Sequence, residues 1–210
     1  HGQVVHFDTN AERELFSWVR GVNAHLPSSI AVRWASEVGG GENGFHARFS
    51  ATSRTYHYLI YNHPIRSPLW ERRAGWVFRP LDVETMHHAA QALVGTHDFS
   101  AFRAAQCQAN SPIRTLHRIH AQRHNDLVIL TLNANAFLHH MVRNVVGSLI
   151  QVGNGNRPVS WIAELLASGE RELAAPTFSP DGLYLAKVDY DANWNLPLAE
   201  TDLPFLKNLQ

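Results

Sequence analysis

The sequence predicts an α+β fold in which helices cover one face of a mixed or antiparallel sheet. Residues 45–61 alternate as one long strand with two distinct faces. Residues 116–122 and 127–132 read as two strands of a hairpin joined by a polar turn. Residues 136–152 carry apolar side chains in two adjacent rows at helical spacing. No repeat of 20–50 residues is visible, so a repeat architecture is not indicated.

The first quarter of the chain predicts a strand, a helix and a second strand. Residues 3–7 alternate in the extended manner, and residues 10–23 place apolar side chains at i, i+3, i+4 and i+7. Leu26 and Pro27 end this helix, and residues 30–34 follow as a strand.

The glycines at 39–41 form the plainest flexible joint in the sequence. We therefore predict that residues 1–44 are the remainder of an N-terminal half and residues 45–196 are a C-terminal half. Residues 197–210 are predicted to be an irregular tail. The chain opens directly on an extended segment, which predicts that further residues precede it in the complete protein.

The remaining elements are marked by turn and cap residues. Pro-rich residues 63–80 are predicted to form a loop, and residues 96–114 to be irregular. Three further elements are expected: a helix over 83–94 capped by Asp82, a helix from Ser160 to about residue 167, and a last strand over 183–190.

The net charge of zero hides an uneven distribution. Residues 46–143 hold eleven Arg and no Lys against five acids, whereas residues 144–210 hold four basic and eight acidic groups. The middle region also holds eleven of the fourteen His. A basic zone within a neutral protein favours a surface for a polyanion such as RNA. Scattered, solvated arginines are the alternative.

Several classes of site are not indicated. The His pairs 87–88 and 139–140 are adjacent in sequence, and neighbours on a helix point in different directions, so no metal site is predicted. Residues 39–41 lack the Lys-Ser/Thr of a phosphate loop, so no nucleotide cofactor is expected. No apolar run has the length of about 20 residues that a membrane helix needs. The single Cys107 is typical of the reducing cytoplasm, where we place the protein.

Tyr56 and Arg143 are the leading candidate site residues. Tyr56 shares a strand face with Arg54, and an aromatic ring beside a guanidinium can stack on an extruded base while phosphate is held nearby. Arg143 lies on the less apolar face of its predicted helix, one turn before Gly147, where another segment could approach the backbone. The alternatives are a cross-strand core aromatic for Tyr56 and a solvated cation for Arg143.

Four segments in order resemble the signatures of the tRNA pseudouridine synthase A family. They read HARFSATSRTYHYLIYN, HDFSAFRAAQCQ, ANAFLHHMVRNVVGSLIQVG and GLYLAKVDY, and GQVVHF and GVNAHLP match an earlier part of the family. The resemblance runs from Gly2 to about Tyr190. It implies the pseudouridine synthase fold, with two ferredoxin-like halves of which the first is incomplete here.

The resemblance also implies roles for individual residues. Tyr56 matches the active-site Tyr that stacks on the target uracil, Arg143 the Arg that pairs with the catalytic Asp, and Leu183 the apolar residue beneath the base. His140 lies in the same motif as Arg143 and is expected to contact the substrate. The motifs that line the RNA cleft include Arg48, Arg54, Asp98, Phe102 and Arg103.

In that family the catalytic Asp lies in a Gly-Arg-Thr-Asp-Ala-Gly loop shortly before Gly-Gln-Val-Val-His-Phe. No Asp of the 210 residues follows Gly-Arg-Thr. The resemblance implies that the complete protein is an isomerase, which acts on uridines 38–40 of the tRNA anticodon arm without a cofactor and as a homodimer. The 210 residues alone are expected to be inactive. A tRNA-binding module without catalysis, or a purely structural fragment, is the alternative.

Overall fold

The long strand β1 (Ala51–Asn62) organises the sheet because three other strands pair with it. The structure is a computed structural model that describes residues 2–41 and 44–197. β5 (Leu127–Ala134) pairs antiparallel with β1 along most of its length. On the other side, β6 (Leu183–Tyr190) pairs antiparallel with the first part of β1 and β2 (Gly75–Val77) pairs parallel with its end.

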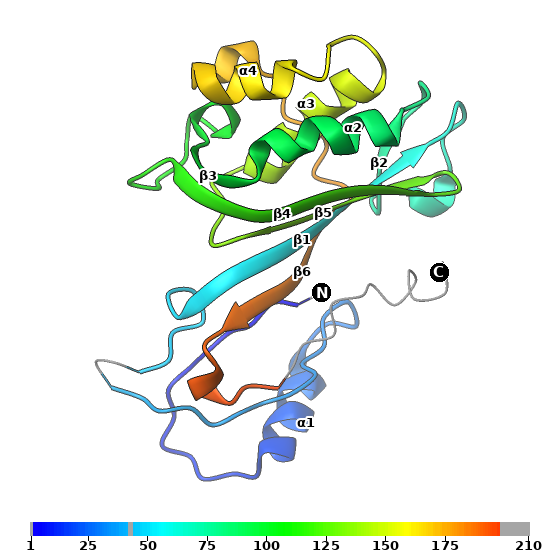
Figure 1. Cartoon of the computed structure of the whole chain (residues 1–210). Helices are drawn as coiled ribbons and strands as arrows, with labels where there is room; N and C mark the ends of the chain where they lie inside the picture. The colour runs from blue at the N-terminus through cyan, green and yellow to red at the C-terminus, as the bar shows by residue number, and fades with distance from the viewer. Residues whose placement is uncertain (1, 42–43, 198–210) are drawn as a thin grey trace.

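The sheet is completed by β4 (Ile113–His124) and the short β3 (Gly95–Asp98). Its strand order is β2-β1-β5-β4-β3, with β6 beside β1, and Figure 1 shows every α-helix except the first in the chain above it. The described residues thus form a six-stranded mixed sheet, which agrees with the predicted α+β class. The hairpin between β4 and β5 turns at Asn125, where φ is 51°.

Three helices cover one face of the sheet: α2 (Val83–Ala90), α3 (Met141–Gly153) and α4 (Trp161–Ser168). Their buried side chains and those of β1, β4 and β5 make one hydrophobic core. Asp82 caps α2 as predicted, since its carboxylate accepts the backbone N–H of Thr85 at 3.0 Å. Ser160 lies at the start of α4 as predicted, but its side chain makes no capping hydrogen bond.

The outer edge of β4 is closed by side chains from α2 and the turn that follows it. β3 pairs only with residues 113–116, so the rest of this edge lacks a strand partner among the described residues. Gln91 donates to the carbonyl of Ile119 at 3.2 Å, and the N–H of Ala121 donates to His87 Nδ1 at 3.4 Å. These contacts occupy backbone groups that would otherwise attract another strand.

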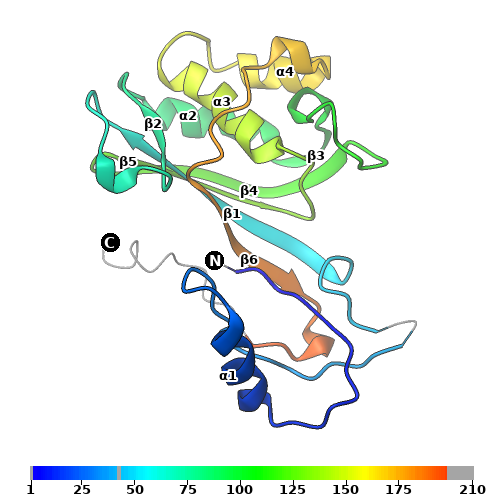
Figure 2. The same cartoon turned by 180° about the vertical axis from the view of Figure 1, so that it is seen from behind.

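The N-terminal region differs most from the prediction. Residues 3–7 and 30–34 do not form strands, because an alternating segment becomes a strand only when a partner completes its ladder. The N–H of Gly2 donates one hydrogen bond, at 2.8 Å, to the carbonyl of Leu185 in β6, along which the N-terminal segment begins (Figure 2). Val32 instead bonds through both its N–H and C=O to the side chain of Asn23, at 2.7 and 2.9 Å.

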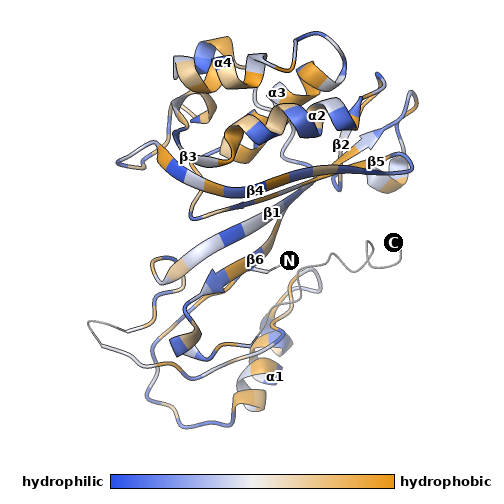
Figure 3. Ribbon diagram, in the orientation of Figure 1, coloured by the Kyte–Doolittle hydropathy of each residue, from blue (hydrophilic) through white to orange (hydrophobic). Residues whose placement is uncertain are grey.

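The helix α1 (Leu15–His25) forms near the predicted position but five residues later, and it ends before Leu26 as expected. None of its residues is buried, although Figure 3 shows hydrophobic residues along it. Leu15 and Phe16 are 47% and 67% exposed. This helix therefore lacks the tertiary packing that stabilises α2, α3 and α4.

Other boundaries shift for local reasons. β1 begins six residues later than predicted because residues 47–49 form a turn, in which Ser50 N donates to the carbonyl of His46 at 2.8 Å. α3 begins at Met141 because His140 takes the left-handed conformation, with φ of 60°. β2 and β3 were not predicted. The predicted tail, apart from Pro197, lies outside the described residues. No helix in the described part of the chain is long and apolar enough to cross a membrane.

Candidate active site

Tyr56 lies in the middle of the sheet on the face that the helices cover. It pairs with Leu132 of β5 and Leu185 of β6, and its ring meets that of Phe137 edge-on at 5.1 Å. The side chain is half-buried, packed against the main core but not enclosed by it. Burial raises the pKa of the Tyr56 hydroxyl, and the charge of Arg54 opposes this rise only in part.

Tyr58 and Leu183 continue the same face. They are direct partners across β1 and β6, and both belong to or pack against the main core. Tyr58 is fully buried and its hydroxyl donates to the carbonyl of Ser179 at 2.7 Å. Burial raises the pKa of Tyr58 well above its usual range, while the nearby charge of Arg143 lowers it and that of Asp181 raises it. Tyr58 thus connects the strand that carries Tyr56 with the surroundings of Arg143.

Arg143 lies in the first turn of α3 and is held at one point of its guanidinium. Its Nε donates to the carbonyl of Phe178 at 2.8 Å, and the N–H of Phe178 approaches the Arg143 carbonyl at 3.4 Å. Within the described residues, neither terminal nitrogen of Arg143 makes a hydrogen bond or ion pair. The guanidinium is therefore oriented while its outer edge stays available to a carboxylate or phosphate.

A buried polar network fixes the segment that holds Arg143. Asn144 is fully buried, and its amide donates to the carbonyl of Phe102 at 2.8 Å. Its Oδ1 accepts from the Thr177 hydroxyl at 2.7 Å and from Arg171 Nη2 at 3.1 Å. Arg171 also donates to the carbonyl of Ala175 at 2.9 Å. Because each buried polar group has a partner, the network rigidifies this region at little desolvation cost.

Residues 174–182 cross α3 and then enter β6, and two glycines allow this crossing. A Cβ on Gly147 would lie 2.6 Å from the carbonyl oxygen of Pro176, so the close approach predicted at Gly147 is confirmed. At Gly182, φ is +95° and a Cβ would lie 2.3 Å from the carbonyl oxygen of Leu59. These contacts bring Phe178 over Tyr58, with ring centroids 5.8 Å apart.

His140 lies beside this site, directly before α3. Its ring stacks on that of His139 with centroids 3.9 Å apart. Burial lowers the pKa of His140, and the charges of His139 and Arg143 lower it further. A neutral imidazole next to Arg143 is therefore favoured at neutral pH.

The other predicted RNA-contact residues differ in how available they are. The guanidinium of Arg54 donates to the carbonyls of Asn135 and Arg48, and that of Arg103 donates to the carbonyls of Cys107 and Ala109. Both arginines therefore brace backbone turns, although each retains unused N–H groups.

Phe102, Asp98 and Arg48 were also predicted to line the RNA cleft. The ring of Phe102 lies wholly inside the core, so any effect of this ring on RNA would pass through its neighbours. Asp98 is exposed and accepts the N–H of Ser100 at 2.8 Å. Arg48 is exposed in the turn before β1 and lies over the ring of Phe49 at 5.7 Å.

Sequence reasoning did not single out Asn144, Arg171, Thr177 or Phe178 as site residues. The position of Asn144 on the polar face of α3, next to Arg143, was the one available signal. The other three come from a segment about 30 residues away in sequence, which nothing local connects to α3.

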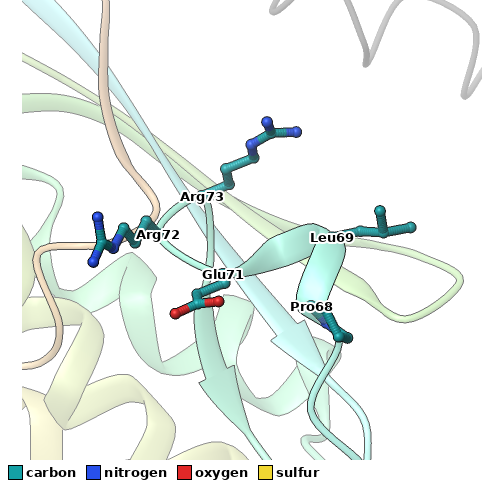
Figure 4. A pocket seen from close by; sticks show the side chains of 5 residues that line it. All are labelled: Pro68, Leu69, Glu71, Arg72 and Arg73. Atoms are coloured by element: carbon teal, nitrogen blue, oxygen red, sulfur yellow. The ribbon is translucent and has the colours of Figure 1, made fainter.

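A cavity of about 420 Å³ has none of these residues in its lining (Figure 4). Pro68, Leu69, Glu71, Arg72 and Arg73 line it. It belongs to the loop between β1 and β2, which packs on the sheet face opposite to Tyr56 through Trp70 and Ala74. It is not part of the Tyr56 and Arg143 site.

Comparison with known proteins gives close relatives. A family model described as tRNA pseudouridine synthase matches residues 89–191. The chain is 66% identical to the tRNA pseudouridine synthase A of Herminiimonas arsenicoxydans, over 94% of the chain and 72% of that protein. It is 62% identical to the protein of the same name from Janthinobacterium sp. (strain Marseille), over 95% of the chain and 76% of that protein. It is 57% identical to the protein of the same name from Bordetella petrii, over 92% of the chain and 71% of that protein.

Proposed function

The chain belongs to the tRNA pseudouridine synthase A family, and from this premise we propose that it converts uridine to pseudouridine at positions 38–40 of the tRNA anticodon stem-loop. The uridine is flipped out of the stack into the site. Its C1′–N1 bond breaks, a C1′–C5 bond forms, C5 loses a proton and N1 gains one. The reaction is an isomerisation without gain or loss of atoms, and it needs no cofactor.

The observation that best supports this function is the hydrogen bonding of the Arg143 guanidinium. Its Nε is bound to the carbonyl of Phe178, whereas its terminal nitrogens make no bond within the described part of the chain. A guanidinium held this way can pair with a carboxylate through its outer edge and keep that carboxylate ionised. An ionised carboxylate is what the cleavage of the C1′–N1 bond requires.

Tyr56 and Leu183 are proposed to hold the detached uracil between them. Tyr56 offers an aromatic face for stacking, and Leu183 supplies an apolar floor on the neighbouring strand. Because burial raises the pKa of Tyr56, its hydroxyl stays protonated at neutral pH. This favours stacking over a role as a resting general base, although the hydroxyl remains able to relay the C5 proton.

The catalytic carboxylate is proposed to come from a Gly-Arg-Thr-Asp-Ala-Gly loop that precedes Gly2 in the complete protein. None of the 210 residues supplies an Asp in that context, and the chain matches 71–76% of the length of the three relatives named above. Without this carboxylate, the 210-residue chain should bind tRNA but not isomerise it. The complete enzyme is proposed to be a cytoplasmic homodimer.

The test is tritium release from tRNA labelled at C5 of uridine, measured for the complete protein and for the 210-residue chain. We expect release by the complete protein and none by the shorter chain, with both binding tRNA. Absence of pseudouridine with the complete protein would refute the proposed reaction. Turnover by the 210-residue chain would instead refute the assignment of the carboxylate.

A further inference from the structure

The structure separates the arginines of the basic zone into two groups. Of the eleven in residues 46–143, five donate hydrogen bonds to backbone carbonyls of the protein: Arg54, Arg103, Arg114, Arg123 and Arg143. For the other six, the described residues provide no hydrogen-bond acceptor or ion-pair partner to the guanidinium: Arg48, Arg66, Arg72, Arg73, Arg79 and Arg118. Four of these six lie between β1 and α2.

These four arginines share their segment with exposed apolar and aromatic side chains. We call residues 63–79 the β1–β2 loop surface. Leu69 is 78% exposed, Trp76 45% and Phe78 56%, and the guanidinium of Arg79 lies over the Phe78 ring at 5.6 Å. Glu71 is the one acid in the segment. Arginines interleaved with aromatic rings suit an RNA strand, because the rings stack on bases and the cations meet phosphates.

The β1–β2 loop surface is built on a backbone that is tied to the sheet. The N–H groups of Arg73 and Ala74 both donate to the carbonyl of Trp70, at 3.0 and 3.1 Å. The carbonyl of Arg73 accepts the hydroxyl of Tyr184 in β6 at 2.6 Å. Arg72 has a positive φ of 59°, which is uncommon for a residue with a side chain. Arg72 and Arg73 both line the 420 Å³ cavity, and Figure 4 shows their side chains extending from the turn in different directions.

From these observations we infer that the β1–β2 loop surface binds the phosphate backbone of the tRNA substrate, with Arg72 and Arg73 as its principal contacts. The inference rests on the proposed function for the identity of the RNA. Gly75 pairs with Ile60, four residues from Tyr56, which is about 13 Å along the strand. The loop packs on the face opposite to Tyr56. RNA that meets both would therefore pass around an edge of the sheet.

A second copy of the chain is less suited than RNA to bind the β1–β2 loop surface. In a symmetric dimer the same patch meets itself, which would bring the arginines of one copy against those of the other. Only Glu71 would offset them. A polyanion neutralises all four charges, so charge complementarity favours RNA.

The test is equilibrium binding of a labelled tRNA transcript to the 210-residue chain across a series of salt concentrations. Replacing both Arg72→Gln and Arg73→Gln should flatten the plot of log affinity against log salt by about one for each phosphate that is no longer neutralised. A fourfold rise in salt should then cost the unaltered chain roughly tenfold more affinity than the variant. Arg66→Gln with Arg79→Gln should give a change in the same direction.

The matched control is Arg20→Gln with Arg157→Gln, which removes two exposed charges on α1 and before α4. Its slope should change less than that of the Arg72 and Arg73 variant. Equal slopes for control, variant and unaltered chain would overturn the inference. So would a change of oligomeric state in sedimentation with an unchanged slope, since that would assign the surface to a second copy. Binding is measured apart from turnover, so failure of the proposed reaction would be seen separately.

Discussion

At the scale of single residues, burial gives chemically similar side chains different tasks. Tyr56 and Tyr58 are two residues apart on one strand face, yet Tyr56 is half-buried and Tyr58 is fully enclosed. The Tyr58 hydroxyl donates to the carbonyl of Ser179, so this side chain packs beside the site and is not available to a substrate. Tyr56 retains an accessible ring, which is what stacking on a base requires.

Replacing Tyr56 tests stacking directly. In the complete protein, Tyr56→Leu should lower product formation by roughly 5- to 150-fold, because stacking on one base contributes about 1–3 kcal/mol. The dissociation constant for tRNA should change little. Tyr56→Phe keeps the ring and separates stacking from proton transfer. Product formation is measured by tritium release. An unchanged product yield with Tyr56→Leu would show that Tyr56 is not part of the site.

The network around Asn144 permits a second prediction at this scale. Asn144→Ala removes the buried donor to the carbonyl of Phe102 and the acceptor that Arg171 and Thr177 share, which should lower the free energy of unfolding by about 1–3 kcal/mol. The loosened segment also carries Phe178, so Arg143 should lose its orientation and kcat should fall more than KM rises.

Ile162→Val is the matched control for Asn144→Ala. It removes a methylene from the core at a cost of about 0.5–1.5 kcal/mol, away from the network. It should keep kcat near that of the unaltered enzyme. If both variants lose stability and both keep kcat, the network only supports the fold and does not position Arg143.

At the scale of elements, close crossings decide where glycine is needed. The segment after α4 crosses α3 at Gly147, and in Gly147→Ala the new Cβ would meet the carbonyl oxygen of Pro176. Alanine favours a helix over glycine by about 1 kcal/mol, but a clash with backbone atoms cannot be relieved by a side-chain rotation. We expect the midpoint of thermal unfolding to fall in this variant.

Gly21→Ala in α1 is the corresponding control, because a Cβ there has open space within 4 Å. It should leave the melting temperature unchanged or raise it. A melting temperature for Gly147→Ala equal to that of Gly21→Ala would show that α3 and the crossing segment can separate at little cost. The crossing would then not be what holds Phe178 against Arg143.

The elements that sequence patterns predicted are those with strong internal periodicity. The β4–β5 hairpin, the body of α3 and the bounds of β6 agree with the prediction. β2 and β3 contain three and four residues, too few for a period to be read, and pairing with β1 and β4 defines them. The extended segments at 3–7 and 30–34 carry the pattern of a strand but lack a ladder.

At the scale of the whole molecule, the N-terminal region and the sheet with its helices differ in packing. α1 contributes no buried residue, whereas most of α3 is buried. A helix with no buried residue opens at a low free-energy cost. We therefore expect amide hydrogens of α1 to exchange about a hundredfold or more faster than those of α3, as measured by hydrogen–deuterium exchange. Equal protection would contradict the predicted division near residue 44.

The sequence alone was enough to indicate the family, the α+β class and the three residues proposed for the catalytic site. It could do so because signature motifs and hydrophobic periods are local properties of the chain. The tertiary structure was needed to tell the arginines that bind backbone carbonyls of the protein from those whose guanidinium groups remain available to a ligand. The acceptor for Arg54 lies 81 residues away in sequence and that for Arg143 lies 35 residues away. A hydrogen bond depends on distance in space, so no local pattern reveals which carbonyl a side chain will reach.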